Sequence, residues 1–285
     1  MPFGVPWRRR TSDRPGGPMM PMPRATWLAA VVVASLHSAE SAFSEEPALV
    51  RPFLFSVSTA PSATSRWAVF TESAIGGGTS APSAYDGLEQ YLGVQGSLGH
   101  GLTLLGQFGM RDSGITAAQG VQQGELLKDL CRGNSSGCVA VGLGARREWD
   151  RTTTFLGRIS VRQSIGRSML VGNVRFERAL TTGRDGIDVI TSLGWAQRVT
   201  RALNIGAEVM GEDLEGFWEN DEAEGGARLF VGPALHVAPP GSKLQLSLVG
   251  GPMIHATRNN YSSSAPRALA GSKGYAARAS LAYSF

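Results

Sequence analysis

The chain has 285 residues, of which 42% are hydrophobic and 18% are charged, and its formal net charge is +4. The positive charge comes from scattered arginines and not from lysine blocks, so the sequence has no polybasic arm for nucleic acid. Beyond residue 45 no segment approaches eighteen consecutive apolar residues, which argues against a transmembrane helix.

The N-terminal region has the features of an export signal. Arg24 precedes an apolar run from Trp27 to Leu36, and a stretch rich in small residues follows that run. This is the order of a secretory signal peptide, and the run is too short to span a bilayer. We expect cleavage between Ala39 and Ser44. Residues 1–43 are therefore interpreted as an N-terminal extension and signal peptide.

Two questions about this region stay open at the level of sequence. Met19, Met20 or Met22 is an alternative start, because residues 1–18 resemble neither a folded segment nor a normal signal start. The arginines at 8–10 offer a twin-arginine signal, but they lie far from the apolar run. Residues 44–65 are expected to form a periplasmic segment, and the sequence does not say whether that segment enters a barrel.

From residue 66 to 285 the apolar residues alternate with small or polar ones. A period of two predicts β-strands, and turn residues divide the region into about twelve of them. An even number of strands with apolar residues at every second position is typical of a single antiparallel transmembrane β-barrel, an all-β fold. The predicted strands cover 66–75, 86–98, 101–112, 118–130, 138–149, 153–165, 168–180, 187–199, 201–212, 225–238, 243–257 and 274–285.

The lengths of the connections test this interpretation, because such barrels have short periplasmic turns and longer outer loops. Connections after even-numbered strands are tight, as at 99–101 and 165–167, whereas 214–225 and 258–273 follow odd-numbered strands and are long. Two connections fit poorly. Residues 150–152 are short for a loop, and the stretch from Cys131 to Cys138 is long for a turn, which leaves the strand count open by two.

Strand parity predicts which side chains face the lumen. In strand 225–238 the residues Leu229, Val231 and Leu235 share the lipid face, so Arg228 and His236 point inward. A charge on the lipid face would cost a few kcal/mol at mid-bilayer. The predicted lumen residues are Arg146, Glu148, Arg158, Arg162, Arg175, Glu177, Glu208, Glu212, Arg228, His236, His255 and Arg278.

These inward charges allow two outcomes. If they pair across strands and large side chains fill the gaps, the lumen is plugged and the network is structural. If they line opposite walls, they form a narrow channel with a slight excess of arginine, which favours small anionic or zwitterionic solutes. Pro233 and Pro252 occur in matching Gly-Pro pairs of neighbouring strands, which predicts a shared bulge or bend.

Cys131 and Cys138 are the only cysteines. In an exported protein an even count predicts one disulfide, here closing a small loop. No histidine lies near them, so we expect neither a metal site nor any other cofactor.

The last strand is the most informative part of the chain. It alternates from Tyr275 to the C-terminal residue, with aromatic residues near both ends. Leu281, Tyr283 and Phe285 resemble the closing strand of bacterial outer-membrane β-barrel proteins, where this pattern is read by the insertion machinery. The resemblance implies a protein of the bacterial outer membrane whose partners are the lipid bilayer, the assembly machinery and small solutes.

Three functions follow from this resemblance. The first is a narrow, porin-like transport pore, and the second is a closed barrel that displays its outer loops. The third is a lipid esterase, because outer-membrane phospholipases and lipid A deacylases carry a His with a Ser two residues on. Here His255 is followed by Thr257 and Asn259, and parity points His255 inward, so we expect no enzyme.

Overall fold

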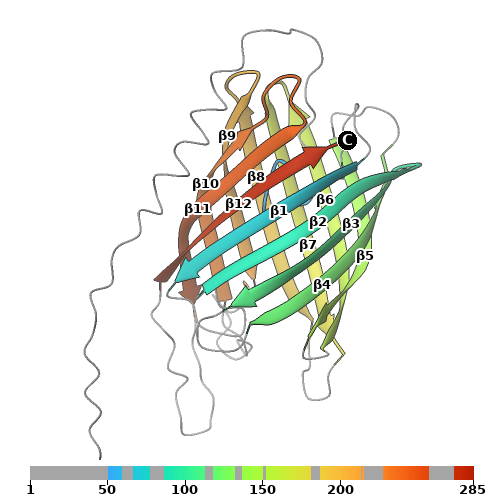
Figure 1. Cartoon of the computed structure of the whole chain (residues 1–285), viewed down its shortest axis with the longest axis vertical. Coiled ribbons are helices and arrows are strands. Elements are labelled where there is room, and N and C mark those ends of the chain that lie inside the picture. Colours follow the sequence, from blue (N-terminus) through green and yellow to red (C-terminus); the bar gives the residue numbers. More distant parts are fainter. Residues whose placement is uncertain are drawn as a thin grey trace, which may run out of the picture. The chain divides into compact units, whose positions relative to one another are not determined.

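The computed structural model describes residues 51–59, 67–77, 87–112, 118–131, 137–149, 152–180, 187–212, 214, 227–256 and 273–285. The predicted transmembrane barrel is confirmed, with twelve strands (Figure 1). The strands are β1 (Trp67–Gly77), β2 (Gly87–Gly99), β3 (Leu102–Asp112), β4 (Gln119–Asp129), β5 (Gly137–Glu148), β6 (Thr153–Ile165), β7 (Ser168–Ala179), β8 (Asp188–Arg198), β9 (Leu203–Glu212), β10 (Ala227–Val237), β11 (Leu244–Ala256) and β12 (Lys273–Ser284).

The sheet closes on itself because β1 pairs with both β2 and β12. All twelve neighbouring pairs are antiparallel and follow chain order, and Thr71 lies opposite Leu281 at the closing seam. Closure leaves no unpaired sheet edge, which a bilayer requires. The predicted strand ends agree with the observed ends to within a few residues. Within the described residues, no helix is long and apolar enough to cross a membrane.

The two faces of each strand differ as the alternation predicts. In β12, Tyr275, Leu281 and Tyr283 are exposed on the outside, whereas Ala276 and Ser280 are buried inside. The same alternation runs around the barrel, and most of the exposed large apolar side chains belong to the outer face. An apolar outside with a polar inside is the arrangement of a barrel in lipid.

The two ends of the barrel differ in their connections. At one end, which we call the turn end, lie Trp67, Phe285 and the connections that follow β2, β4, β6, β8 and β10. The other end, the loop end, carries the connections that follow the odd-numbered strands, including 213–226 and 257–272. The backbone amide of Phe285 donates to the carbonyl of Trp67 (3.0 Å), which joins the last residue to the first strand.

The matching Gly-Pro pairs interrupt the ladder between β10 and β11. Pairing stops after Phe230 and Met253 and resumes at Ala234 and Val249 in the same register. No residue is inserted, so of the predicted bulge or bend the bulge is wrong. The ladder is interrupted although the two backbones stay close, since an added Cβ at Gly251 would lie 2.2 Å from the carbonyl oxygen of Val231. Proline has no N–H to donate there, which accounts for the lost pairing.

Candidate functional site: the occupied lumen

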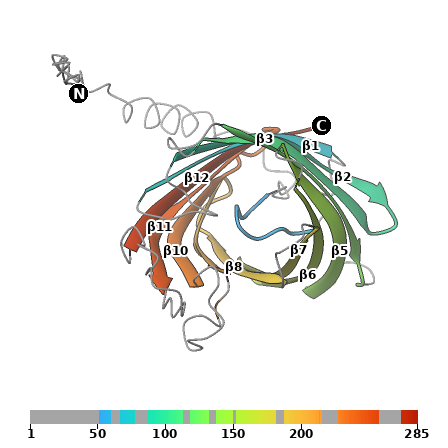
Figure 2. The ribbon, with the colours of Figure 1, turned by 90° about the horizontal axis from the view of Figure 1, so that it is seen from below.

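A segment that precedes the barrel strands lies inside the barrel. Residues 51–59, called here the lumen segment, form no strand, and they run within the ring of strands (Figure 2). Arg51 contacts β1, Phe55 lies near mid-barrel beside β10 and β12, and Ser58 reaches β2 towards the turn end. The segment therefore enters and leaves towards the turn end and has its innermost point near Phe55.

Glu208 of β9 binds the tip of the segment. Its carboxylate accepts the backbone N–H of Leu54 (2.9 and 3.0 Å to its two oxygens) and the backbone N–H of Phe55 (2.7 Å). Glu208 is fully buried, and no cationic side chain lies within ion-pair distance of it among the described residues. The two backbone N–H groups take the place of a cation here. A buried carboxylate is unfavourable unless it is hydrogen-bonded, and hydrogen bonds to a charged group are stronger than those between neutral groups.

The three apolar residues at the tip pack at two places on the barrel wall. Phe53 packs on Val171 and Ala196, and its ring meets the ring of His236 edge-on with 5.5 Å between centroids. The Phe53 ring also fills the space above Gly194, where an added Cβ would lie 2.4 Å from it. Gly194 therefore forms the flat floor of this seat.

Leu54 and Phe55 pack against the largest apolar cluster of the lumen. The cluster lies on β9 to β12, and the ring of Phe55 is 4.8 Å from that of Phe230. The guanidinium of Arg278 lies 4.7 Å from the Phe55 ring centre, a cation–π contact. The wall members of the cluster are Met210, Phe230, Ala234, Val249, Met253 and Ala276.

Side chains of the wall also bind the backbone of the segment directly. Asn173 accepts the N–H of Val57 (2.8 Å), and both Asn173 and Ser160 donate to the carbonyl of Val57 (3.1 and 2.7 Å). The remaining contacts of this kind are hydrogen bonds to carbonyls, from Ser247 to Arg51, from Ser192 to Phe55 and from Gln95 to Ser58. The wall thus holds this bent segment mainly through peptide groups and apolar side chains.

Ion pairs occupy much of the remaining lumen. On four adjacent strands, Arg278 contacts Glu72 (2.9 Å) and Glu89 (3.4 Å), Arg111 contacts Glu89 (2.6 Å), and Arg51 of the lumen segment contacts Glu72 (3.1 Å). Arg51 also lies 4.0 Å from the ring centre of Phe70. Positive and negative groups therefore alternate along this chain of contacts, from Arg51 to Arg111.

A second group of ions lies on β5 and β7. Arg146 and Arg175 both contact the carboxylate of Glu177 (2.8 and 2.6 Å), and Arg146 is 3.6 Å from Glu148. Arg158 and Glu125 form a separate buried pair, and Arg228 pairs with Glu212 towards the loop end. Most lumen arginines thus have a carboxylate within 4 Å, and the seven arginines in these contacts slightly outnumber the six carboxylates.

The structure places eleven of the twelve predicted lumen residues on the inner face, although which of them act in function is untested. For His255 only the backbone is described, opposite Arg228 in the ladder between β10 and β11. His236 is fully buried, and neither ring nitrogen has a hydrogen-bond partner among the described residues. These lumen residues were predicted from the alternation of side chains along each strand, which places every second residue on the inner face.

The prediction omitted several polar residues of the lumen. These are Glu72, Glu89, Arg111, Glu125, Asn173 and Ser192, and the same parity rule would have found them. Arg158 binds one of these omitted residues, Glu125. Nothing in the alternation of the strands indicated that residues 51–59 would bind inside the barrel.

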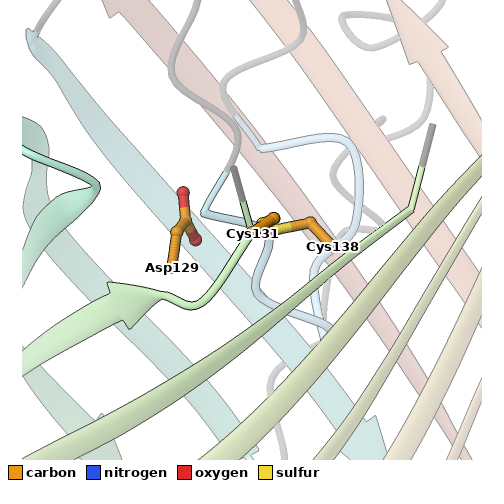
Figure 3. Close-up of side chains that lie close together, drawn as sticks. All are labelled: Asp129, Cys131 and Cys138. Atoms are coloured by element: carbon orange, nitrogen blue, oxygen red, sulfur yellow. A yellow bond between two sulfur atoms is a disulfide. The ribbon is translucent and has the colours of Figure 1, made fainter. Parts of the chain in front are cut away.

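The predicted disulfide between Cys131 and Cys138 is confirmed (Figure 3). It joins the end of β4 to β5 at the turn end, with 5.3 Å between the two Cα atoms. The carboxylate of Asp129 lies beside it, but both sulfurs are bonded to each other and are not available as thiolate ligands. Asp129 instead hydrogen-bonds the side chain of Thr59, at the end of the lumen segment.

The residues considered for an esterase cannot be compared with a catalytic site. Thr257 and Asn259 lie outside the described residues, as do residues 1–50, which contain the predicted signal peptide. The insertion role of Leu281, Tyr283 and Phe285 likewise stays a prediction.

No family model matches the sequence, and no curated protein is significantly similar to it. Among solved structures, the KdgM porin in complex with disordered oligogalacturonate is similar with a TM-score of 0.51 and 10% identity, over 76% of this chain and 99% of that one. A second structure of the KdgM porin gives a TM-score of 0.50 with the same identity and coverage. The Acinetobacter baumannii outer membrane protein Omp33 gives 0.45 and 8% identity, over 78% and 98% of the two chains. At these identities the likeness concerns the fold, which is that of bacterial outer-membrane β-barrels.

Proposed function

We propose that this outer-membrane β-barrel is a channel for small solutes that its own lumen segment closes in the state described here. The observation that carries the proposal is the occupant of the lumen. The middle of the barrel is filled by residues 51–59, which are joined to the wall by hydrogen bonds, ion pairs and packing and by no strand pairing. Such an occupant can leave without unfolding the barrel.

The wall behind the segment favours a pathway for polar solutes. Its ion pairs and the polar side chains of Gln95, Asn173, Ser192 and Ser247 would face water once the segment left. Because the arginines are largely paired, we expect weak charge selectivity and a preference for neutral or zwitterionic solutes. With the turn end in the periplasm, the segment would close the channel from the periplasmic side.

The alternative is a permanently closed barrel with a structural or surface-interaction role. Two features favour the closed barrel, because their side chains narrow the lumen. They are the buried pair of Arg158 and Glu125 and the apolar cluster around Phe230. Neither proposal includes catalysis.

Single-channel recording in planar bilayers tests the choice. The variant Leu54→Asp/Phe55→Asp places two carboxylates beside Glu208 and in the apolar cluster, which should expel the segment. Leu54→Met/Phe55→Leu keeps the tip apolar and serves as the matched control. We expect long-lived conducting states from the Asp variant and few from the wild type and the control. An Asp variant that is heat-modifiable yet never conducts would leave the closed barrel as the function.

A further inference from the structure

The lumen wall binds a short, bent stretch of polypeptide, which in the structure is the lumen segment. Phe53 has its own seat, Leu54 and Phe55 share the cluster around Phe230, and the peptide groups of the segment are bound by side chains from several strands. The wall makes few contacts that depend on a polar side chain of the segment. Contacts of this kind include those of Arg51 with Glu72 and Phe70, of Ser56 with Ser192 and of Thr59 with Asp129.

Glu208 is the group that points most clearly to a ligand. It is fully buried, and the partners that it has among the described residues are the peptide N–H groups of Leu54 and Phe55. If the segment left, this carboxylate would face the lumen beside the apolar cluster with no cationic partner. A ligand that replaced the segment would need N–H donors next to large apolar groups, as the backbone of a peptide provides.

We infer that the lumen binds short apolar peptides, which compete with the lumen segment for the same seats. The seat formed by Val171, Ala196 and Gly194 accepts an aromatic side chain, and the cluster around Phe230 and Met253 accepts the next two residues. A free N-terminal ammonium near Glu208 would add a charged contact. This inference deepens the proposed channel function by naming a substrate class, and it rests on the proposal that the segment can leave.

The test uses the full chain and a synthetic nonapeptide with the sequence of residues 51–59, carrying a fluorophore. The receptor is the variant Leu54→Asp/Phe55→Asp, whose own segment is expelled. A second nonapeptide with aspartate in place of its Leu and second Phe is the ligand control. We expect saturable binding of the first peptide, at least about tenfold weaker binding of the second, and about tenfold weaker binding of the first when Glu208→Gln is added to the receptor.

A second measurement covers the case in which the Asp variant does not assemble. In the otherwise wild-type chain, Ser56→Cys introduces a thiol at a buried position of the lumen segment. Excess unlabelled nonapeptide should displace the segment and raise the rate of maleimide labelling several-fold, whereas the aspartate peptide should not. Equal effects of the two peptides, or no saturable binding in either assay, would overturn the inference.

The two assays distinguish failure of the peptide-binding inference from failure of the proposed channel function. If the Asp variant conducts and the nonapeptide neither binds nor blocks the current, the channel stands and the peptide site falls. If the nonapeptide binds but the variant never conducts, the lumen is a peptide-binding site in a closed barrel.

Discussion

Arg158 of β6 and Glu125 of β4 meet across the intervening strand β5 through two hydrogen bonds of 2.7 Å each. They can meet because β5 has no side chain on its inner face at Gly142 and Gly144. A Cβ at Gly144 would lie 2.7 Å from the side chain of Glu125. Arg158 also donates to Asn173 (2.9 Å), which in turn binds the lumen segment at Val57. The ion pair therefore supports both the barrel wall and the bound segment.

Replacing Arg158 should destabilise the barrel strongly. Its side chain and that of Glu125 are 3% and 1% exposed, so Arg158→Gln would leave a buried carboxylate without its counter-ion, with the hydrogen bond from Gln123 remaining. We expect the free energy of unfolding to fall by about 3–5 kcal/mol. Urea unfolding in detergent micelles, followed by tryptophan fluorescence, measures the change.

Arg162 provides the matched control on the same strand. It is half-buried and makes no ion pair within 4 Å among the described residues. Arg162→Gln should therefore change the unfolding free energy by less than about 1 kcal/mol. Equal losses for the two variants would contradict the role assigned to the pair of Arg158 and Glu125.

The comparison of these two arginines shows how far the sequence alone could predict the lumen. A period of two places Arg158 and Arg162 on the inner face, because side chains of a strand alternate between two sides. The alternation does not predict which side chains Arg158 and Arg162 contact. Glu125 lies two strands away from Arg158, and the contact depends on the relative register of β4, β5 and β6 and on the bare stretch at Gly142 and Gly144.

The lumen segment was even less predictable. Residues 51–59 are too short a stretch to predict a position inside the barrel, and their conformation is determined by contacts with residues far away in the chain, such as Asn173 (116 positions) and Ser247 (196 positions). The strands carried a strong local signal since lipid outside and polar groups inside impose the alternation. Long-range side-chain contacts impose no such pattern on the sequence.

Weakening the hydrogen bonds between Glu208 and the lumen segment should increase the exposure of the segment to solvent without unfolding the barrel. In Glu208→Gln the charged acceptor of the Leu54 and Phe55 amides becomes a neutral one, and each hydrogen bond to a charged group contributes about 1.5–3 kcal/mol. We expect the labelling rate of a Ser56→Cys reporter to rise about tenfold or more. A rate equal to that of the parent Ser56→Cys protein would show that Glu208 does not hold the segment.

A bulkier residue at Gly194 should expel Phe53 from its seat. Valine there would overlap the Phe53 ring, so Gly194→Val should raise both the labelling of the Ser56→Cys reporter and the frequency of conducting states. Gly172→Val is the control, because Gly172 faces outward on the adjacent β7 and the nearest atom to an added Cβ is 3.7 Å away. An unchanged labelling rate in Gly194→Val would contradict the packing described for Phe53.

The disulfide should stabilise the turn end of the barrel. Cys131 and Cys138 close a loop with a sequence separation of 7, for which the chain-entropy relation gives about 2–3 kcal/mol. Cys131→Ser/Cys138→Ser should lower the unfolding free energy by that amount, and reductant should affect the wild type alone. Free thiols in protein purified from the envelope without reductant would contradict the bond.

The last residue should matter for assembly more than for stability. Phe285 lies after the end of β12 with its side chain 57% exposed, and its one backbone hydrogen bond to Trp67 is at the closing seam. Loss of so exposed a residue removes little buried area, so the free energy of unfolding should fall by no more than about 1 kcal/mol.

If the C-terminal strand is the signal for the insertion machinery, however, deletion of Phe285 should sharply reduce the heat-modifiable protein in the outer membrane while export continues. Phe285→Trp keeps a terminal aromatic residue and should assemble normally. Full assembly of the deletion variant at wild-type yield would show that Phe285 is not part of an insertion signal.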